Sequence, residues 1–174
     1  MRILILFGFL FAFTACQQKS IQQYIVKNSE SPNFISMNIS PKDYLSDKST
    51  GKENIFNIIE RVNLLLLNNS DSLQLKKEYD EVATILKDEK YQDLIRTTDK
   101  GIKFQVDYVG TDENIKEVII LILQKEEKMA LLRILSNGLD VTQLSKISTT
   151  LSGNSVDEEG LKNLFEKISV ALKK

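Results

Sequence analysis

One cysteine carries the clearest chemical signal in this sequence. Cys16 is the only cysteine among the 174 residues, and it follows Phe13, Thr14 and Ala15. An apolar residue and two small residues before a cysteine form the box at which lipoprotein precursors are cleaved and acylated, although Leu is the usual residue where Phe13 stands. We therefore predict that residues 1–15 are a signal peptide and that the Cys16 sulfur carries a thioether-linked lipid.

The stretch before the cysteine favours this interpretation over two alternatives. Arg2 is followed by an apolar run from Ile3 to Phe13, and polar residues begin at Gln17. A membrane-spanning helix needs about 20 apolar residues, so the run is too short to be one. Ordinary secretory cleavage requires a small residue three positions before the cut, where this chain has Phe13.

The rest of the chain has few of the groups that enzymes use. It contains no histidine, the commonest general base and metal ligand, and its one thiol is assigned to the lipid. The sequence has no phosphate-binding loop, dinucleotide-binding glycine motif or nucleophile elbow. We therefore expect a protein that is not an enzyme and that uses no cofactor and no metal ion. The rival prediction is a hydrolase that uses a carboxylate pair or a Ser–Lys arrangement.

Two groups of carboxylates are candidate sites. Asp157, Glu158 and Glu159 form one cluster, and Asp112 and Glu113 form the other. A calcium or acid–base role is conceivable for the first cluster, but acidic residues at the start of a helix are explained by capping and by the helix dipole. The second pair lies in an expected hairpin loop, where solvent-exposed carboxylates are ordinary.

Two tyrosines on expected strands complete the candidates. Tyr91 and Tyr108 could line a ligand surface, and the interpretation that we favour is a cross-strand packing pair.

Charge and length limit the class of protein further. The formal net charge is −1, and removal of Arg2 with the signal peptide makes it −2. Such a balance predicts no electrostatic attraction to nucleic acid. The length suits one folded domain, which we place at residues 34–174. Residues 16–33 are polar and predict a flexible tether, although Ile21 and Ile25 have the spacing of a short helix.

The elements that must position any site are those of an α+β domain. We predict a mostly antiparallel sheet of about four to six strands, packed against two to four helices. Strands are expected at residues 34–40, 62–67, 91–97, 102–108, 115–123 and 129–135. The alternation in 102–108 predicts one face in the core and one in water, and the unbroken apolar run in 115–123 predicts a central strand.

Helices are expected in the first half of the domain at two places. A capping box from Thr50 to Glu53 precedes an apolar stripe that ends at Val62. A second stripe, from Leu75 to Leu86, follows the N-cap residues around Asp71. Its opposite face is charged, and we expect that face to be solvated. The charged residues are Lys76, Lys77, Glu78, Asp80 and Glu81.

Two more helices are expected at the end of the chain. Asn137-Gly138 should end the last strand, and the capping box from Asp140 to Gln143 should begin a short helix. A third box, from Ser155 to Glu158, should begin the terminal helix. Its apolar stripe should cover the sheet of its own domain rather than a partner. That stripe consists of Leu161, Leu164, Phe165, Ile168 and Leu172.

The order of these elements resembles a known family. The chain is similar to the domain of unknown function 4252, a group of small Bacteroidetes lipoproteins, over most of residues 34–151. The resemblance is carried by the lipid-attachment box and by Ile115-Lys116-Glu117 before the central strand. Gly138-Leu139-Asp140 matches a further family segment in part. The resemblance implies a fold and an address, and the family has no established activity to transfer.

We therefore expect a lipid-anchored protein of the bacterial cell envelope that faces the periplasm. The stretch after Cys16 has no acidic run of the kind that directs surface display, so the inner leaflet of the outer membrane is the expected location. The expected partners are the membrane, through the lipid, and an envelope protein or a small ligand bound on the sheet or helical surface. A component of an envelope-sensing circuit is the alternative.

Overall fold

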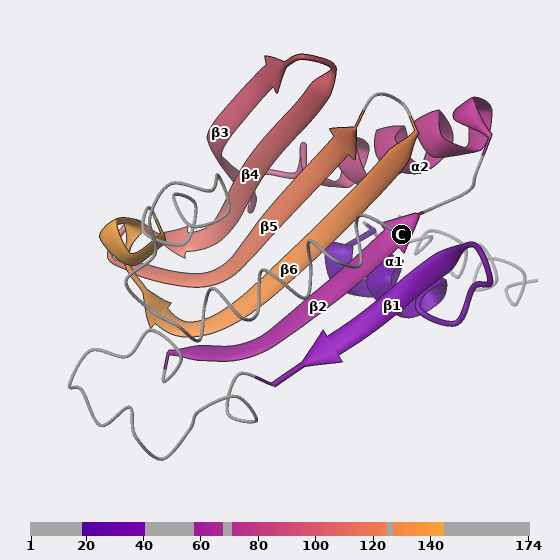
Figure 1. Cartoon of the computed structure of the whole chain (residues 1–174). Helices are drawn as coiled ribbons and strands as arrows, with labels where there is room; N and C mark the ends of the chain where they lie inside the picture. Colours follow the sequence, from indigo (N-terminus) through magenta and orange to yellow (C-terminus); the bar gives the residue numbers. More distant parts are fainter. Residues whose placement is uncertain (1–18, 41–57, 68–70, 125–126, 145–174) are drawn as a thin grey trace, which may run out of the picture.

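The computed structural model describes residues 19–40, 58–67, 71–124 and 127–144. These residues form a six-stranded sheet in which every neighbouring pair is antiparallel, with strand order β1-β2-β6-β5-β4-β3 (Figure 1). The predicted α+β fold with a mostly antiparallel sheet is confirmed. The strands are β1 (Phe34–Ile39), β2 (Ile59–Leu67), β3 (Gln92–Asp99), β4 (Ile102–Thr111), β5 (Asn114–Gln124) and β6 (Lys128–Leu139).

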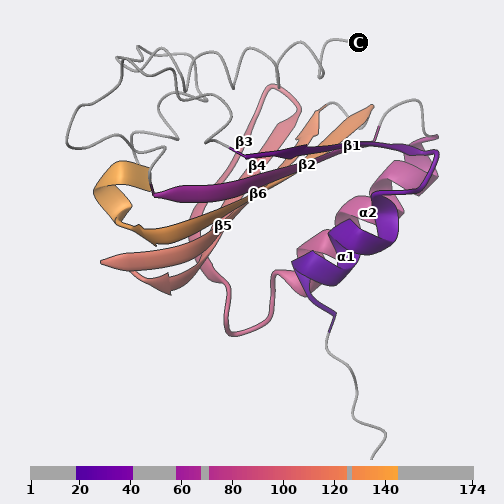
Figure 2. The ribbon, with the colours of Figure 1, turned by 90° about the horizontal axis from the view of Figure 1, so that it is seen from below.

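Both long helices lie on the same face of the sheet. Helices α1 (Ile21–Asn28) and α2 (Ser72–Ile85) run side by side beneath it (Figure 2). We call this the helix face; its buried side chains include Leu65, Leu121 and Leu131 together with Leu75 and Val82 of α2. Residues of the opposite parity in the strands form a separate apolar cluster, which lies on what we call the second face.

Helix α1 corrects the prediction of a flexible tether. Residues 21–28 are helical, and Ile21 and Tyr24 are almost completely buried. A capping box starts the helix, because the Ser20 and Gln23 side chains each bond to the other's backbone N–H. The short helix indicated by the spacing of Ile21 and Ile25 is therefore the correct alternative, and the folded domain begins before residue 34.

Three further predictions need correction. Ile59 and Val62 lie in β2, not in a helix, and they pair antiparallel with β6. Strand β6 does not end at Asn137-Gly138 but continues to Leu139, because Gly138 adopts a φ of +87° that lets the strand bend without breaking. The polar side of β4 does not face water: Gln105 and Asp107 are 5% and 1% exposed.

Other predicted elements are confirmed where the structure describes them. Asp71 caps α2, and the Asp140 carboxylate and Gln143 amide form the predicted reciprocal capping box, with bonds of 2.7 and 3.0 Å. Gly101 supplies a positive φ in the turn between β3 and β4. The signal peptide, the capping boxes at 50–53 and 155–158, and the terminal stripe at 161–172 lie outside the described residues.

Candidate functional site

The structure places some of the sequence candidates and leaves others outside its described part. Cys16 and the carboxylates Asp157, Glu158 and Glu159 lie outside it. Asp112 and Glu113 occupy the turn between β4 and β5, as predicted. Asp112 accepts a hydrogen bond of 2.5 Å from the Tyr108 hydroxyl, and its backbone oxygen accepts one from Val141 N. These bonds give Asp112 a structural role.

The predicted pairing of the two tyrosines is wrong. Tyr91 belongs to the cluster on the helix face, and its hydroxyl accepts a hydrogen bond of 3.2 Å from the backbone N–H of Ile21. Tyr108 belongs to the cluster on the second face, and its hydrogen bond to Asp112 raises its pKa. Both rings are less than 10% exposed, so neither lines an open ligand surface.

Part of the charged surface of α2 contacts α1 rather than solvent. The Tyr24 hydroxyl donates to Glu78 at 2.8 Å, and Lys19 and Lys27 lie 3.0 and 3.7 Å from Glu81. Burial alone would raise the pKa of Glu81, but the Lys19 hydrogen bond and the two positive charges outweigh it and lower that pKa. The expectation of a fully solvated face is therefore wrong on the side that α1 covers.

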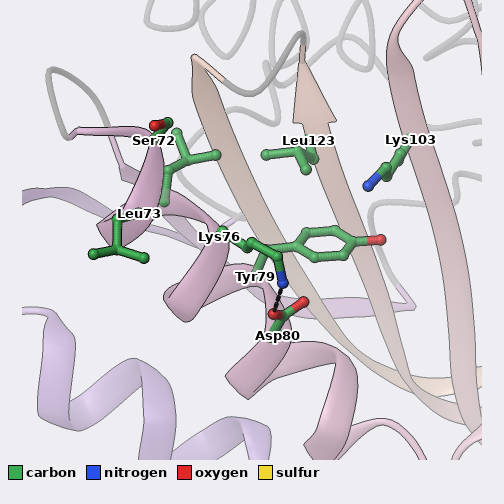
Figure 3. Close-up of a pocket in the computed structure, with 8 residues that line it drawn as sticks. Ser72, Leu73, Lys76, Tyr79, Asp80, Lys103 and Leu123 are labelled. Atoms are coloured by element: carbon green, nitrogen blue, oxygen red, sulfur yellow. Dashed lines mark hydrogen bonds and ion pairs between the residues drawn. The ribbon is translucent and has the colours of Figure 1, made fainter.

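A small pocket lies between the N-terminal half of α2 and strands β4 and β5. Its volume is about 260 Å³, and the side chain of Tyr79 points towards Lys103 (Figure 3). The Lys103 ammonium lies 5.5 Å from the centre of that ring, a cation–π arrangement. The lining residues are Ser72, Leu73, Leu75, Lys76, Tyr79, Asp80, Lys103 and Leu123.

The pocket has an apolar floor and a polar rim. Leu75 and Leu123 are buried, whereas Leu73 is 79% exposed beside them. On the rim, Lys76 donates to Asp80 at 2.5 Å, and Lys103 is exposed near the start of β4. Two lysines against one aspartate leave the lining with a positive net charge. Such a surface is complementary to an apolar group with a negative charge next to it.

The same pocket contains the residue types of a Ser–Lys arrangement, but their geometry is not that of an activated nucleophile. Ser72 and Lys76 both line it. A lysine that activates a serine must be a neutral base held in a desolvated site. The Lys76 side chain is 72% exposed and forms an ion pair with Asp80, so it is not held in a desolvated site. The pocket therefore supports binding better than it supports hydrolysis.

A buried carboxylate, Asp107, lies on the same face of β4, four residues beyond Lys103 of the pocket. Gln105 Nε2 donates to Asp107 at 2.8 Å. The pKa of Asp107 is raised to about 6, mainly because the carboxyl is buried, although the Gln105 hydrogen bond lowers it. The negative charge of Asp93 also contributes to the raised pKa, and the positive charge of Arg96 opposes it. Perturbed acids of this kind are common at functional sites, but Asp107 is only 1% exposed and does not line the pocket.

A second polar group crosses the sheet beside α1. Asn38, Asn63 and Arg133 occupy one continuous register across β1, β2 and β6. Arg133 donates to Glu117 at 2.8 Å and to Gln22 of α1, and Asn63 donates to Asn38 at 2.5 Å. Because each polar side chain here has a partner, the row ties α1 to the sheet and offers no free ligand group.

Two searches of the described residues bear on cofactors and membranes. They contain no group of three or more His, Cys, Asp or Glu side chains arranged to hold a metal ion. None of the helices in the described ranges is long and apolar enough to cross a bilayer.

Comparison with protein families identifies the chain. The model of the family described as Domain of unknown function (DUF4252) matches residues 25–147. The chain belongs to the DUF4252 family. The match starts within α1 and therefore agrees with the corrected start of the folded domain. Comparisons with curated proteins and with solved structures find no match.

Sequence reasoning missed the pocket and the contact between the helices. Lys103 and Leu123 lie at least 23 positions beyond the α2 residues of the pocket, and no local pattern joins α2 to β4. For α1 there was a usable signal, because Ser20 and Gln23 have the spacing of a capping box directly before Ile21, Tyr24 and Ile25.

Proposed function

We propose that this DUF4252 protein is a lipid-anchored, periplasm-facing envelope protein that binds a protein partner and catalyses no reaction. The lipid on Cys16 would hold the domain at the inner leaflet of the outer membrane. The sequence before Cys16 supports the anchor, and the absence of histidine from the chain supports a binding role.

The pocket beside α2 is the observation that carries the binding role. Sites for small molecules usually enclose about 300–1,000 Å³ and bury most of the ligand. This pocket is smaller, at about 260 Å³, and opens beside the exposed Leu73. A volume of this size suits one apolar side chain of a partner protein better than a whole small molecule.

The charge of the rim defines the partner further. Lys103 and Lys76 flank the apolar floor made by Leu75 and Leu123. A partner segment that inserts an apolar side chain would therefore gain from an Asp or Glu next to that side chain. We assign the pocket to such an acidic segment of an envelope protein.

Site-specific photo-crosslinking in cells tests this proposal. A photoreactive amino acid replaces Leu73 in the intact lipoprotein, and the matched control replaces Val26, which is 60% exposed on α1 and does not line the pocket. We expect one dominant adduct from position 73 and none from position 26. The crosslinked partner peptide should contain an apolar residue next to an acidic one.

Charge reversal provides the second arm of the experiment. Lys103→Glu should abolish the adduct at position 73, because it replaces one of the two lysines of the rim with a negative charge. Circular dichroism checks that this surface variant folds. Equal adducts from both positions, or an adduct that Lys103→Glu leaves unchanged, would contradict the proposed binding site.

A further inference from the structure

The second face of the sheet is apolar across its whole width. Three successive registers run through all six strands on this face, and nearly every position in them is an apolar residue. The central register consists of Met37, Leu64, Leu132, Ile120, Val106 and Ile95. The registers on either side begin at Ile35 and Ile39 of β1 and continue in the same way.

The described residues do not account for the burial of this face. Leu64, Ile120 and Leu132 are 1%, 2% and 4% exposed, although α1 and α2 lie on the other side of the sheet (Figure 2). Within the described ranges, the residues outside the strands that pack on this cluster are Ile58, Val141 and Leu144. Six strands about 4.8 Å apart span about 24 Å, which three side chains cannot cover.

The chain leaves the described structure on this face. Leu144 is 1% exposed and belongs to the same apolar cluster, and 30 residues follow it. Those residues include the capping box that begins at Ser155 and the apolar stripe from Leu161 to Leu172. A helix of about 20 residues would be about 30 Å long, enough to cross the width of the sheet.

We infer that the C-terminal segment, residues 145–174, docks through its apolar stripe on the second face of the sheet. The occupant is this chain's own segment rather than a second copy or a partner, because the face is buried within a single chain and the segment starts beside it. Two other long stretches lie outside the described ranges, residues 1–18 and residues 41–57. The apolar run of the first belongs to the segment that we predict to be removed as a signal peptide. Residues 41–57 remain. They are mostly polar and lack such a stripe.

The absence of tryptophan from the chain allows a direct test with single reporters. Phe165→Trp places the reporter in the stripe, and Glu166→Trp places the matched control one position away on the polar side of the expected helix. Leu172→Trp is a second reporter in the stripe, in case Phe165→Trp does not fold. We expect blue-shifted emission and several-fold weaker acrylamide quenching for Trp in the stripe than for the control.

Energy transfer then identifies the face. The full chain carries Cys16→Ser, and a new cysteine is labelled with a short-range acceptor of tryptophan fluorescence. The cysteine is placed on the second face, by Ile35→Cys or Ile102→Cys, or on α1, by Val26→Cys. All three side chains are partly exposed. Transfer from the stripe reporter should be strong to the first two positions and weak to the third.

Three results would overturn the inference. The first is equal quenching of the stripe and control reporters by acrylamide. The second is energy transfer that is strongest to position 26. The third is energy transfer between separate reporter and acceptor chains after they are mixed, which would assign the face to a second copy.

Discussion

Asp107 offers the sharpest test of the fold, because its substitution should stabilise the protein. The carboxylate is 1% exposed on the helix face, and its one hydrogen bond from a side chain comes from Gln105. Asp107→Asn keeps an oxygen that can accept this bond and removes the buried negative charge. We therefore expect the variant to be more stable than the wild type at neutral pH.

The size of the effect follows from the pKa. Burial raises the pKa of Asp107 from 3.8 to about 6. At about 1.4 kcal/mol for each tenfold change in proton affinity, ionisation of Asp107 costs the folded state about 3 kcal/mol at most. Because the folded pKa is the higher one, this cost is absent below pH 4, grows as the pH rises from 4 to 6, and is constant above pH 7.

Urea denaturation followed by circular dichroism between pH 4 and pH 8 measures this difference. The stability of Asp107→Asn relative to the wild type should rise by 1 to about 3 kcal/mol across that range. Asp99→Asn, on the exposed end of β3, is the control and should show no such rise. If Asp107→Asn is no more stable than the wild type at pH 8, the claim that the buried Asp107 charge destabilises the folded state is wrong.

Other predictions concern the backbone and the polar row. Gly110→Ala should cost about 2 kcal/mol or more, because Gly110 has a φ of +131° and an added Cβ would lie 2.3 Å from the Asn114 carbonyl oxygen. Gly138→Ala, whose added Cβ would lie 3.4 Å from the nearest neighbour, should cost about 1 kcal/mol in the same denaturation assay, and equal losses would contradict this account. Glu117→Ala should cost about 2 to 3 kcal/mol because it leaves the Arg133 guanidinium buried without its carboxylate. Adding Arg133→Met should recover part of that loss in a double-mutant cycle, and purely additive losses would contradict coupling across the pair.

The sheet could be predicted from the sequence because its strands are strongly patterned. The alternation from Ile102 to Tyr108 and the apolar run from Ile115 to Leu123 fix β4 and β5, and both elements lie where expected. The stripe from Ile55 to Val62 led to a wrong prediction of helix at Ile59 and Val62. Helix spacing over so few residues also fits the start of a strand, and these residues pair with β6. Tertiary pairing decided the outcome there.

The environment of polar residues could not be predicted in the same way. Periodicity indicated that Gln105 and Asp107 lie on one side of β4, but not that this side faces α2. The contact of α1 with Glu78 and Glu81 depends on two helices that are about 50 residues apart. Such neighbours are set by packing between distant elements, and the pocket beside Tyr79 is a product of the same packing.

Mass spectrometry of the native protein's N-terminus tests the central claim most directly. The proposal predicts that the membrane fraction contains a chain that begins at Cys16 and carries an acyl mass on the thiol, and that Cys16→Ala abolishes both. Recovery of a soluble native chain with residues 1–16 still attached and no acyl mass at Cys16 would contradict the anchored protein proposed above.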